Sequence, residues 1–282
     1  MRSRVQKEQA NFDSGLRFLE LAENICRDHE ATEEAETILG DVWHTIGAIA
    51  NEINEPDRCL HYTQMVVDVK LRSANSTGIR DRNLAVAFNQ HAIGLLMVGK
   101  LTEAEAEVRE ALAIMEKVVG DDKELMSGYV LNLGYSLWLQ GRLEESRTTL
   151  EEGLLIRKKK FGINDKESYR SVTLLYCDSY IVADRVLTRT GAYLAALGNV
   201  YLAKGELAKA ETLHCRAQTQ YESTWGKWHH RTGDLHHMMA RYEIRKQNWA
   251  EAELVTPSSA LDFLGARLLT PVAAGNYCLR RC

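Results

Sequence analysis

Four histidines in two adjacent pairs are the first residues whose type and spacing suggest chemistry. The pairs flank the segment RTGDL, and their members are His229, His230, His236 and His237. Imidazole nitrogens bind zinc and related metals when several converge on one face and hydrogen-bonding neighbours orient them. No such neighbours are visible around these pairs. Solvent-facing or groove-lining histidines are therefore the favoured interpretation, and we predict no metal site.

A run of four basic residues, Arg157 to Lys160, is the next candidate for a binding function. It lies at the end of a predicted helix, where positive charge stabilises the negative end of the helix dipole. A single run of this length is typical of a solvated helix face. We therefore interpret it as a solvated face and predict no nucleic-acid binding.

Catalytic patterns are missing from the sequence. It contains none of GxxxxGK[ST], GxGxxG, GxSxG and HExxH, which mark nucleotide-binding loops, dinucleotide-binding turns, serine nucleophiles and zinc-protease helices. Paired acids such as Glu144 and Glu145 lie on predicted exposed faces, with no pocket to shift their pKa values. We therefore predict no catalytic residues, no cofactor and no enzymatic activity.

The composition favours a helical protein inside the cell. Only 3 of the 282 residues are proline, and 39 acidic and 35 basic residues give a net charge of −4. The six cysteines are far apart in the sequence, which fits a reducing compartment better than a disulfide scaffold. No apolar run is long enough for a signal peptide or a membrane span. We expect a soluble, cytoplasmic protein that contacts no membrane.

An internal repeat organises the chain. Gly99 and Gly141 are 42 residues apart, and each opens a similar segment that closes on another glycine 21 residues later. A third segment of the same length runs from Gly205 to Gly226. Self-similarity at a fixed period is the signature of repeat architectures.

Each repeat is predicted to be a pair of helices joined by a glycine turn. An apolar segment precedes the first glycine of each copy, and apolar residues of helical spacing follow it. Small residues recur where paired helices must approach closely, because larger side chains would overpack the crossing. They are Ala92, Gly134, Gly198 and Ala240 on first helices and Ala111, Gly153 and Ala217 on second helices. The predicted fold is all-α, an α-α superhelix of antiparallel hairpins.

These repeats resemble tetratricopeptide repeats. The 42-residue spacing, the triplet Asn132-Leu133-Gly134 and the segment EALAIMEKVVG from Glu110 to Gly120 are similar to the kinesin-light-chain subtype. The resemblance covers most of the chain from Gly15 to Ala252. It implies a superhelical solenoid that binds other proteins, although repeats of this family serve many unrelated partners. Similar arrays occur at the carboxyl ends of fungal STAND-type NTPases with an NB-ARC core.

The period extends in both directions from the three clear copies. Upstream, TILGDVWHTIGAIANEI and RCLHYTQMVVDVK form an earlier hairpin, and the segment from Gly15 to Cys26 resembles an unpaired second helix. Downstream, DLHHMMARYEIRKQ is another first helix. The predicted division is a flexible N-terminus at 1–11, tetratricopeptide-like repeats at 12–170, a period-breaking insert at 171–189, further repeats at 190–254 and an irregular C-terminal tail at 255–282.

Two interpretations of the insert remain open. Gly141 and Gly205 are 64 residues apart where 42 are expected. Repeat arrays tolerate insertions on one face, so the extra residues are explained by a short added helix or loop. The alternative is an unspliced intron, because the segments that end at Arg170 and begin at Thr190 would join almost without a break. Sequencing of cDNA separates the two.

The binding residues are predicted from the repeat register. First helices line the concave wall of such a superhelix, and their inward positions are Asn89, Gln90, Asn132, Tyr135, Asn199, His237 and Arg241. Carboxamides pair with both N–H and C=O groups of an extended peptide. Simple solvation of these amides is an equally weighted alternative.

Two hypotheses about function follow. The first is a scaffold or adaptor that binds a peptide or partner helix in its concave groove. The second is the sensor or self-association arm of a larger STAND-type signalling NTPase, which the unpaired helix near Gly15 and the incomplete last hairpin favour. The expected partner is a protein or peptide, with self-association as a further possibility.

Overall fold

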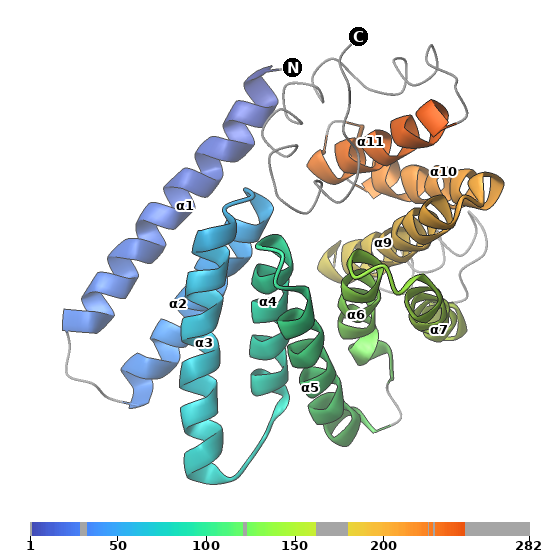
Figure 1. Cartoon of the computed structure of the whole chain (residues 1–282). Coiled ribbons are helices and arrows are strands. Elements are labelled where there is room, and N and C mark those ends of the chain that lie inside the picture. The colour runs from blue at the N-terminus through green and yellow to red at the C-terminus, as the bar shows by residue number, and fades with distance from the viewer. Residues whose placement is uncertain are drawn as a thin grey trace. The chain divides into compact units, whose positions relative to one another are not determined.

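The computed structural model describes residues 2–28, 33–120, 123–161, 180–224, 226–227 and 229–245, and in these ranges every regular element is helical (Figure 1). The described elements are ten α-helices and one short 3-10 helix, which confirms the all-α prediction. The chain divides into two compact units, Met1–Asp121 and Asp122–Cys282.

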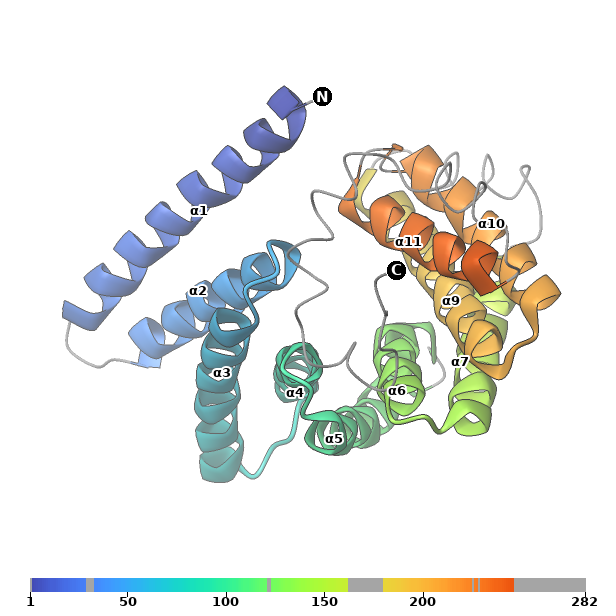
Figure 2. The ribbon, with the colours of Figure 1, turned by 45° about the horizontal axis from the view of Figure 1, so that its top comes forward.

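The first unit is a row of antiparallel helices in chain order. Its helices are α1 (Arg2–Asp28), α2 (Glu33–Glu52), α3 (Pro56–Thr77), α4 (Arg82–Met97) and α5 (Leu101–Val119). Each helix packs against the next, and Figures 1 and 2 both show α3 between α2 and α4. The predicted early hairpin is therefore α2 and α3, and the hairpin around Gly99 is α4 and α5.

The second unit continues the pattern. Its elements are η1 (Lys123–Met126), α6 (Ser127–Leu139), α7 (Leu143–Phe161), α9 (Tyr180–Lys204), α10 (Leu207–Thr224) and α11 (His230–Arg245). Helix α6 pairs with α7 and α9 pairs with α10, while α7 packs on α9 and α10 on α11. Leu150, Tyr193, Val200 and Ala217 lie in the largest described core of this unit and are fully buried.

Left-handed backbone conformations join the paired helices. Gly99, Gly141 and Gly205 have φ between 77° and 80°, which confirms the predicted glycine turns. The turn between α2 and α3 uses Asn54 at φ 60°. Asparagine is among the few other residues that adopt this conformation without a large penalty.

The predicted small residues lie at helix crossings. Ala92, Ala111 and Ala217 are fully buried, and Ala240 is nearly so. A Cβ atom at Gly134 would overlap the side chain of Leu150, at Gly198 that of His214, and at Gly153 that of Tyr193 on the following first helix. Gly47 and Gly191 are two further positions of this kind, with added Cβ atoms 2.8 Å from Thr63 and 2.6 Å from Tyr221.

Two helices extend beyond the predicted boundaries. Residues 2–11, set apart in the sequence as a flexible N-terminus, are the first turns of α1. That segment contains neither glycine nor proline and is composed largely of residues that tolerate a helix. Residues 180–189 of the predicted insert are the first turns of the 25-residue helix α9. Residues 171–179 and the predicted tail at 255–282 lie outside the described residues.

Candidate interaction site

The seven predicted binding residues are distributed over four first helices. Asn89 and Gln90 lie half-buried on α4 in the first unit. In the second unit, Asn132 and Tyr135 lie on α6, Asn199 on α9, and His237 and Arg241 on α11. Five of the seven therefore belong to one compact unit, and the description of the site concentrates on that unit.

Tyr135 links α6 electrostatically to α11. Its ring makes an edge-to-face contact with Trp138, with centroids 6.0 Å apart. Burial raises the pKa of the Tyr135 hydroxyl to about 12, and the nearby carboxylate of Asp234 also raises it while Arg231 opposes the change. The hydroxyl is therefore neutral at physiological pH and able to donate and accept hydrogen bonds.

His237 shares this neighbourhood. Burial lowers the pKa of its imidazole, Arg241 lowers it further, and Asp234 acts in the opposite direction. Asp234 therefore influences both Tyr135 and His237. The inner residues of α6 and α11 form one polar surface, which carries one acidic side chain, basic side chains from Arg231 and Arg241, and a neutral phenol.

Three members of this surface were missed in the sequence. Tyr221 is almost fully buried, and burial, Tyr135 and Asp234 raise its pKa while Arg231 opposes them. Arg231 and Asp234 approach from the start of α11. The repeat register contained the signal for Asp234, because it precedes His237 by three residues and so lies on the same helix face.

Asn199 has a different environment from the other predicted residues. It is 6% exposed, and its Oδ1 lies 3.1 Å from Nε2 of His214 on the partner helix α10. A neutral imidazole protonated on Nε2 donates this bond. Burial lowers the pKa of His214 to about 4, so the neutral form dominates at neutral pH. The carboxamide of Asn199 is thus engaged inside its own hairpin.

The basic run contains one buried residue, which corrects its interpretation as a solvated face. Arg157 is fully buried, whereas Lys159 is exposed. The Arg157 guanidinium donates to the hydroxyls of Ser127 and Thr190, each over 3.1 Å. The reason is register: Arg157 follows Leu150 by seven residues and shares its inward helix face.

The histidine pairs do not converge. Nε2 of His236 lies 3.2 Å from the Gln218 carboxamide and 3.8 Å from Glu222, whereas His237 is influenced by Arg241 and Asp234. In the part of the chain that the structure describes, no group of three His, Cys, Asp or Glu residues is arranged to hold a metal ion. None of the described helices is long and apolar enough to cross a membrane.

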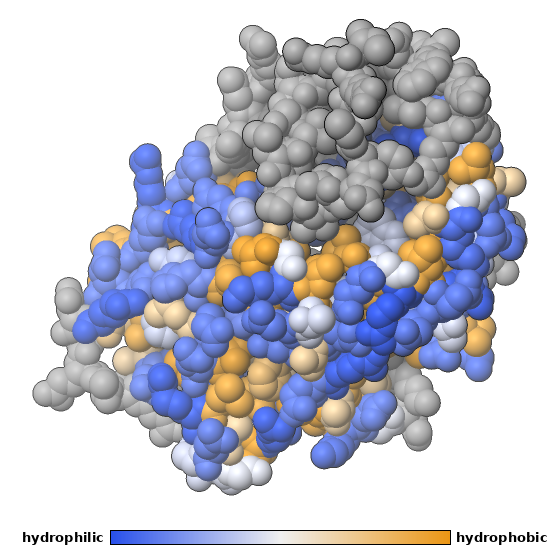
Figure 3. Space-filling model, viewed as in Figure 1, coloured by the Kyte–Doolittle hydropathy of each residue, from blue (hydrophilic) through white to orange (hydrophobic). Residues whose placement is uncertain are grey.

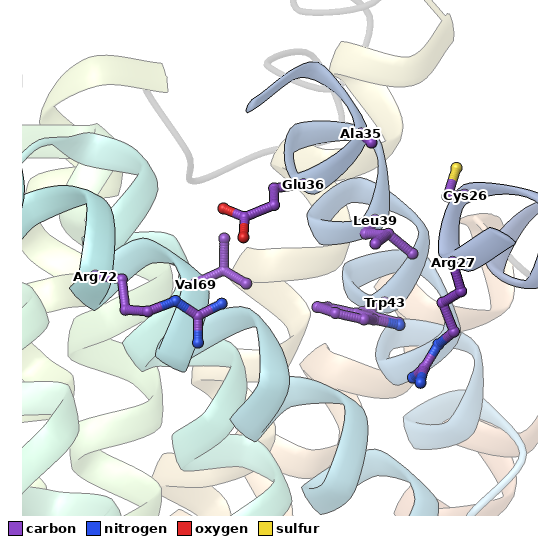
Figure 4. A pocket seen from close by; sticks show the side chains of 8 residues that line it. All are labelled: Cys26, Arg27, Ala35, Glu36, Leu39, Trp43, Val69 and Arg72. Carbon is purple, nitrogen blue, oxygen red and sulfur yellow. The ribbon is translucent and has the colours of Figure 1, made fainter. Parts of the chain in front are cut away.

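A shallow pocket lies in the first unit between α1, α2 and α3 (Figure 4). Trp43 lines it beside Cys26 and Arg27 of α1, and Val69 and Arg72 line it from α3. The carboxylate of Glu23 accepts hydrogen bonds from the Trp43 indole over 2.9 Å and from Arg27 over 2.7 Å. These contacts fasten α1 to α2. On the face in Figure 3, hydrophobic side chains form separate patches among hydrophilic ones.

Comparisons with known proteins define the class of the fold. The tetratricopeptide repeat model matches residues 84–122 and 130–166. BtubC (BKLC) from P. vanneervenii has a similar structure, with a TM-score of 0.53 and 12% identity over 97% of this chain and 95% of that chain. A crystal structure of a Podosopora anserina kinesin light chain with nearly identical TPR-like repeats matches with a TM-score of 0.51 and 14% identity, over 84% of this chain and 97% of that chain. No curated protein matches the chain.

The two matched segments are tetratricopeptide repeats, and the chain shares its fold with kinesin-light-chain-like repeat proteins. The hairpins around Gly99 and Gly141 are the ones that match, as the sequence indicated. Tetratricopeptide repeats mediate protein–protein interaction and are typically non-catalytic. Their presence indicates a protein-interaction scaffold.

Proposed function

We propose that the chain is a scaffold that binds a peptide or partner helix on the inner face of its first helices. The observation that carries this proposal is the tandem array of helical hairpins that matches the tetratricopeptide repeat model. In the second unit the contact residues are Asn132, Tyr135, His237 and Arg241. Asn89 and Gln90 provide the equivalent contacts in the first unit.

The chemistry of this face suits a polar, extended ligand. Carboxamides donate to and accept from peptide groups, and the neutral Tyr135 hydroxyl does the same. Asp234 and Arg241 supply opposite charges on one helix, so the face has no strong net sign. Affinity then depends on several modest hydrogen bonds, each with a net value of about 0.5 to 1.5 kcal/mol.

Site-specific crosslinking of a selected peptide tests where the ligand binds. Peptides are first selected from a random library on the full chain. A photo-reactive benzoylphenylalanine is then placed at His237, on the inner face of α11, or at Leu155, an exposed residue of α7 that serves as control. Crosslinking from position 237 but not from 155 is the expected result. Crosslinking from position 155 alone would contradict the proposal.

The second hypothesis, a sensor or self-association arm of a STAND-type NTPase, stays a prediction. Inspection of the genomic DNA upstream for an in-frame nucleotide-binding domain tests it directly.

A further inference from the structure

Helix α1 carries large apolar side chains on two opposite faces. Leu16 and Glu23 are buried on the side that packs against α2, where Leu19 and Ala22 also lie. On the opposite side Phe18, Leu21 and Ile25 are 72%, 56% and 52% exposed. Spacings of three and four residues place these three on one helix face. We call this face the α1 stripe.

The position of α1 in the row of helices identifies the kind of helix it is. It packs on the first helix that follows it, α2, in the same way that α3 packs on α4, α7 on α9 and α10 on α11. Each of those three helices also packs on a preceding first helix. In the ranges that the structure describes, α1 makes the first of these contacts and leaves the α1 stripe uncovered.

The α1 stripe does not have the character of a solvent cap. Terminal elements of repeat arrays stay soluble by presenting a polar outer face. Three adjacent large apolar side chains, each more than half exposed, instead mark an interaction surface.

The chain itself shows which chemistry covers such a face. Within the hairpins, a large side chain of the second helix fills the space left by a small residue of the first helix. Leu150 occupies the space at Gly134, and Thr63 lies where a Cβ at Gly47 would be 2.8 Å away. A second copy of α1 would set large side chains against large ones and lacks this complement.

We propose that the α1 stripe docks an amphipathic α-helix of a partner protein, antiparallel to α1, with a glycine or alanine at the crossing. This surface is separate from the inner face of the first helices and does not depend on it. The chain would therefore hold two partners, or two parts of one partner, at different places.

Binding of a first-helix peptide tests the proposal. The probe is a fluorescein-labelled peptide with the chain's own sequence from Asp81 to Gly99, which contains α4, its capping residue and Ala92 at the crossing. Fluorescence anisotropy follows its titration with the full chain. We expect saturable binding that Leu21→Ser weakens about tenfold, because a buried apolar contact is lost. A peptide with Ala92→Leu is expected to bind more weakly.

Matched variants separate this surface from others. Ile79→Ser removes an equally exposed side chain outside the stripe and should leave binding unchanged. Asn132→Ala, on the inner face of the second unit, should also leave it unchanged. Absence of saturable binding, or equal binding by the Leu21→Ser chain with its circular dichroism unaltered, would overturn the proposal. So would a dimer in sedimentation equilibrium that Leu21→Ser abolishes, since a second copy would then be the occupant.

Discussion

The Arg157 guanidinium on α7 donates to the hydroxyl of Ser127, the first residue of α6, over 3.1 Å. A second bond to Thr190 connects the same guanidinium to α9. The Tyr193 hydroxyl donates to the backbone carbonyl of Ser127 over 2.6 Å. A buried polar cluster therefore fastens three consecutive helices of the second unit at one point.

Replacement of Arg157 by alanine should destabilise the second unit. The change leaves the hydroxyls of Ser127 and Thr190 with fewer partners and opens a cavity, at a cost of about 2 to 4 kcal/mol. Urea unfolding of the full chain measures it. Lys159→Ala, two residues away on the exposed side of the same helix, is the control and should leave the midpoint unchanged. Equal midpoints for both variants would show that Arg157 contributes little to stability.

Glycine positions at and away from helix crossings should respond oppositely to alanine. Gly134→Ala forces a Cβ into Leu150 and should cost about 1 to 3 kcal/mol. Gly233→Ala lies within α11 with no atom within 4 Å of the added Cβ, and should stabilise by about 0.5 to 1 kcal/mol. Thermal melting of both variants checks the sign. A stabilised Gly134→Ala chain would show that the crossing is looser than described.

His214 should make the fold sensitive to acid. Its folded-state pKa is about 4, below the ordinary value of 6.5, because burial disfavours the charged imidazole. The unfolded chain therefore binds a proton first as pH falls, so this stabilisation is complete above pH 6.5 and is lost toward pH 4. Between pH 7.5 and 5 the loss is about 2 kcal/mol at most. His214→Gln should show a smaller change in urea unfolding over this range, and an identical pH dependence would contradict the assignment.

Asn199 should act on stability before it acts on binding. Asn199→Ala removes the partner of His214 Nε2 and leaves a buried donor unsatisfied, which costs about 1 to 3 kcal/mol. Asn132→Ala on the half-buried face of α6 is the comparison and should cost less. Urea unfolding of the two variants decides the matter. A larger loss for Asn132→Ala would reverse the roles assigned to these residues.

The sequence predicted the features that depend on spacing. Turn glycines such as Gly99 and crossing residues such as Ala111 recur at a fixed period, and their backbone or packing requirements are local. Arg157 could not be predicted in the same way, because a long cationic side chain is usually solvated and only its tertiary partners explain its burial. The register also treated Asn199 as inward-facing, since a period does not reveal a hydrogen bond to the partner helix. The extent of α1 beyond Gly15 was missed because its polar first turns carry no repeat signal.

Titration calorimetry of a selected peptide tests the central claim, that the inner face of the first helices binds the partner. Wild type, Asn132→Ala, His237→Ala and the double variant are compared at low and high salt, with circular dichroism as the control for folding. We predict graded losses of about 0.5 to 1.5 kcal/mol for each single change, a larger loss for the double variant and weak dependence on salt. Unchanged affinity of the folded double variant would contradict this account.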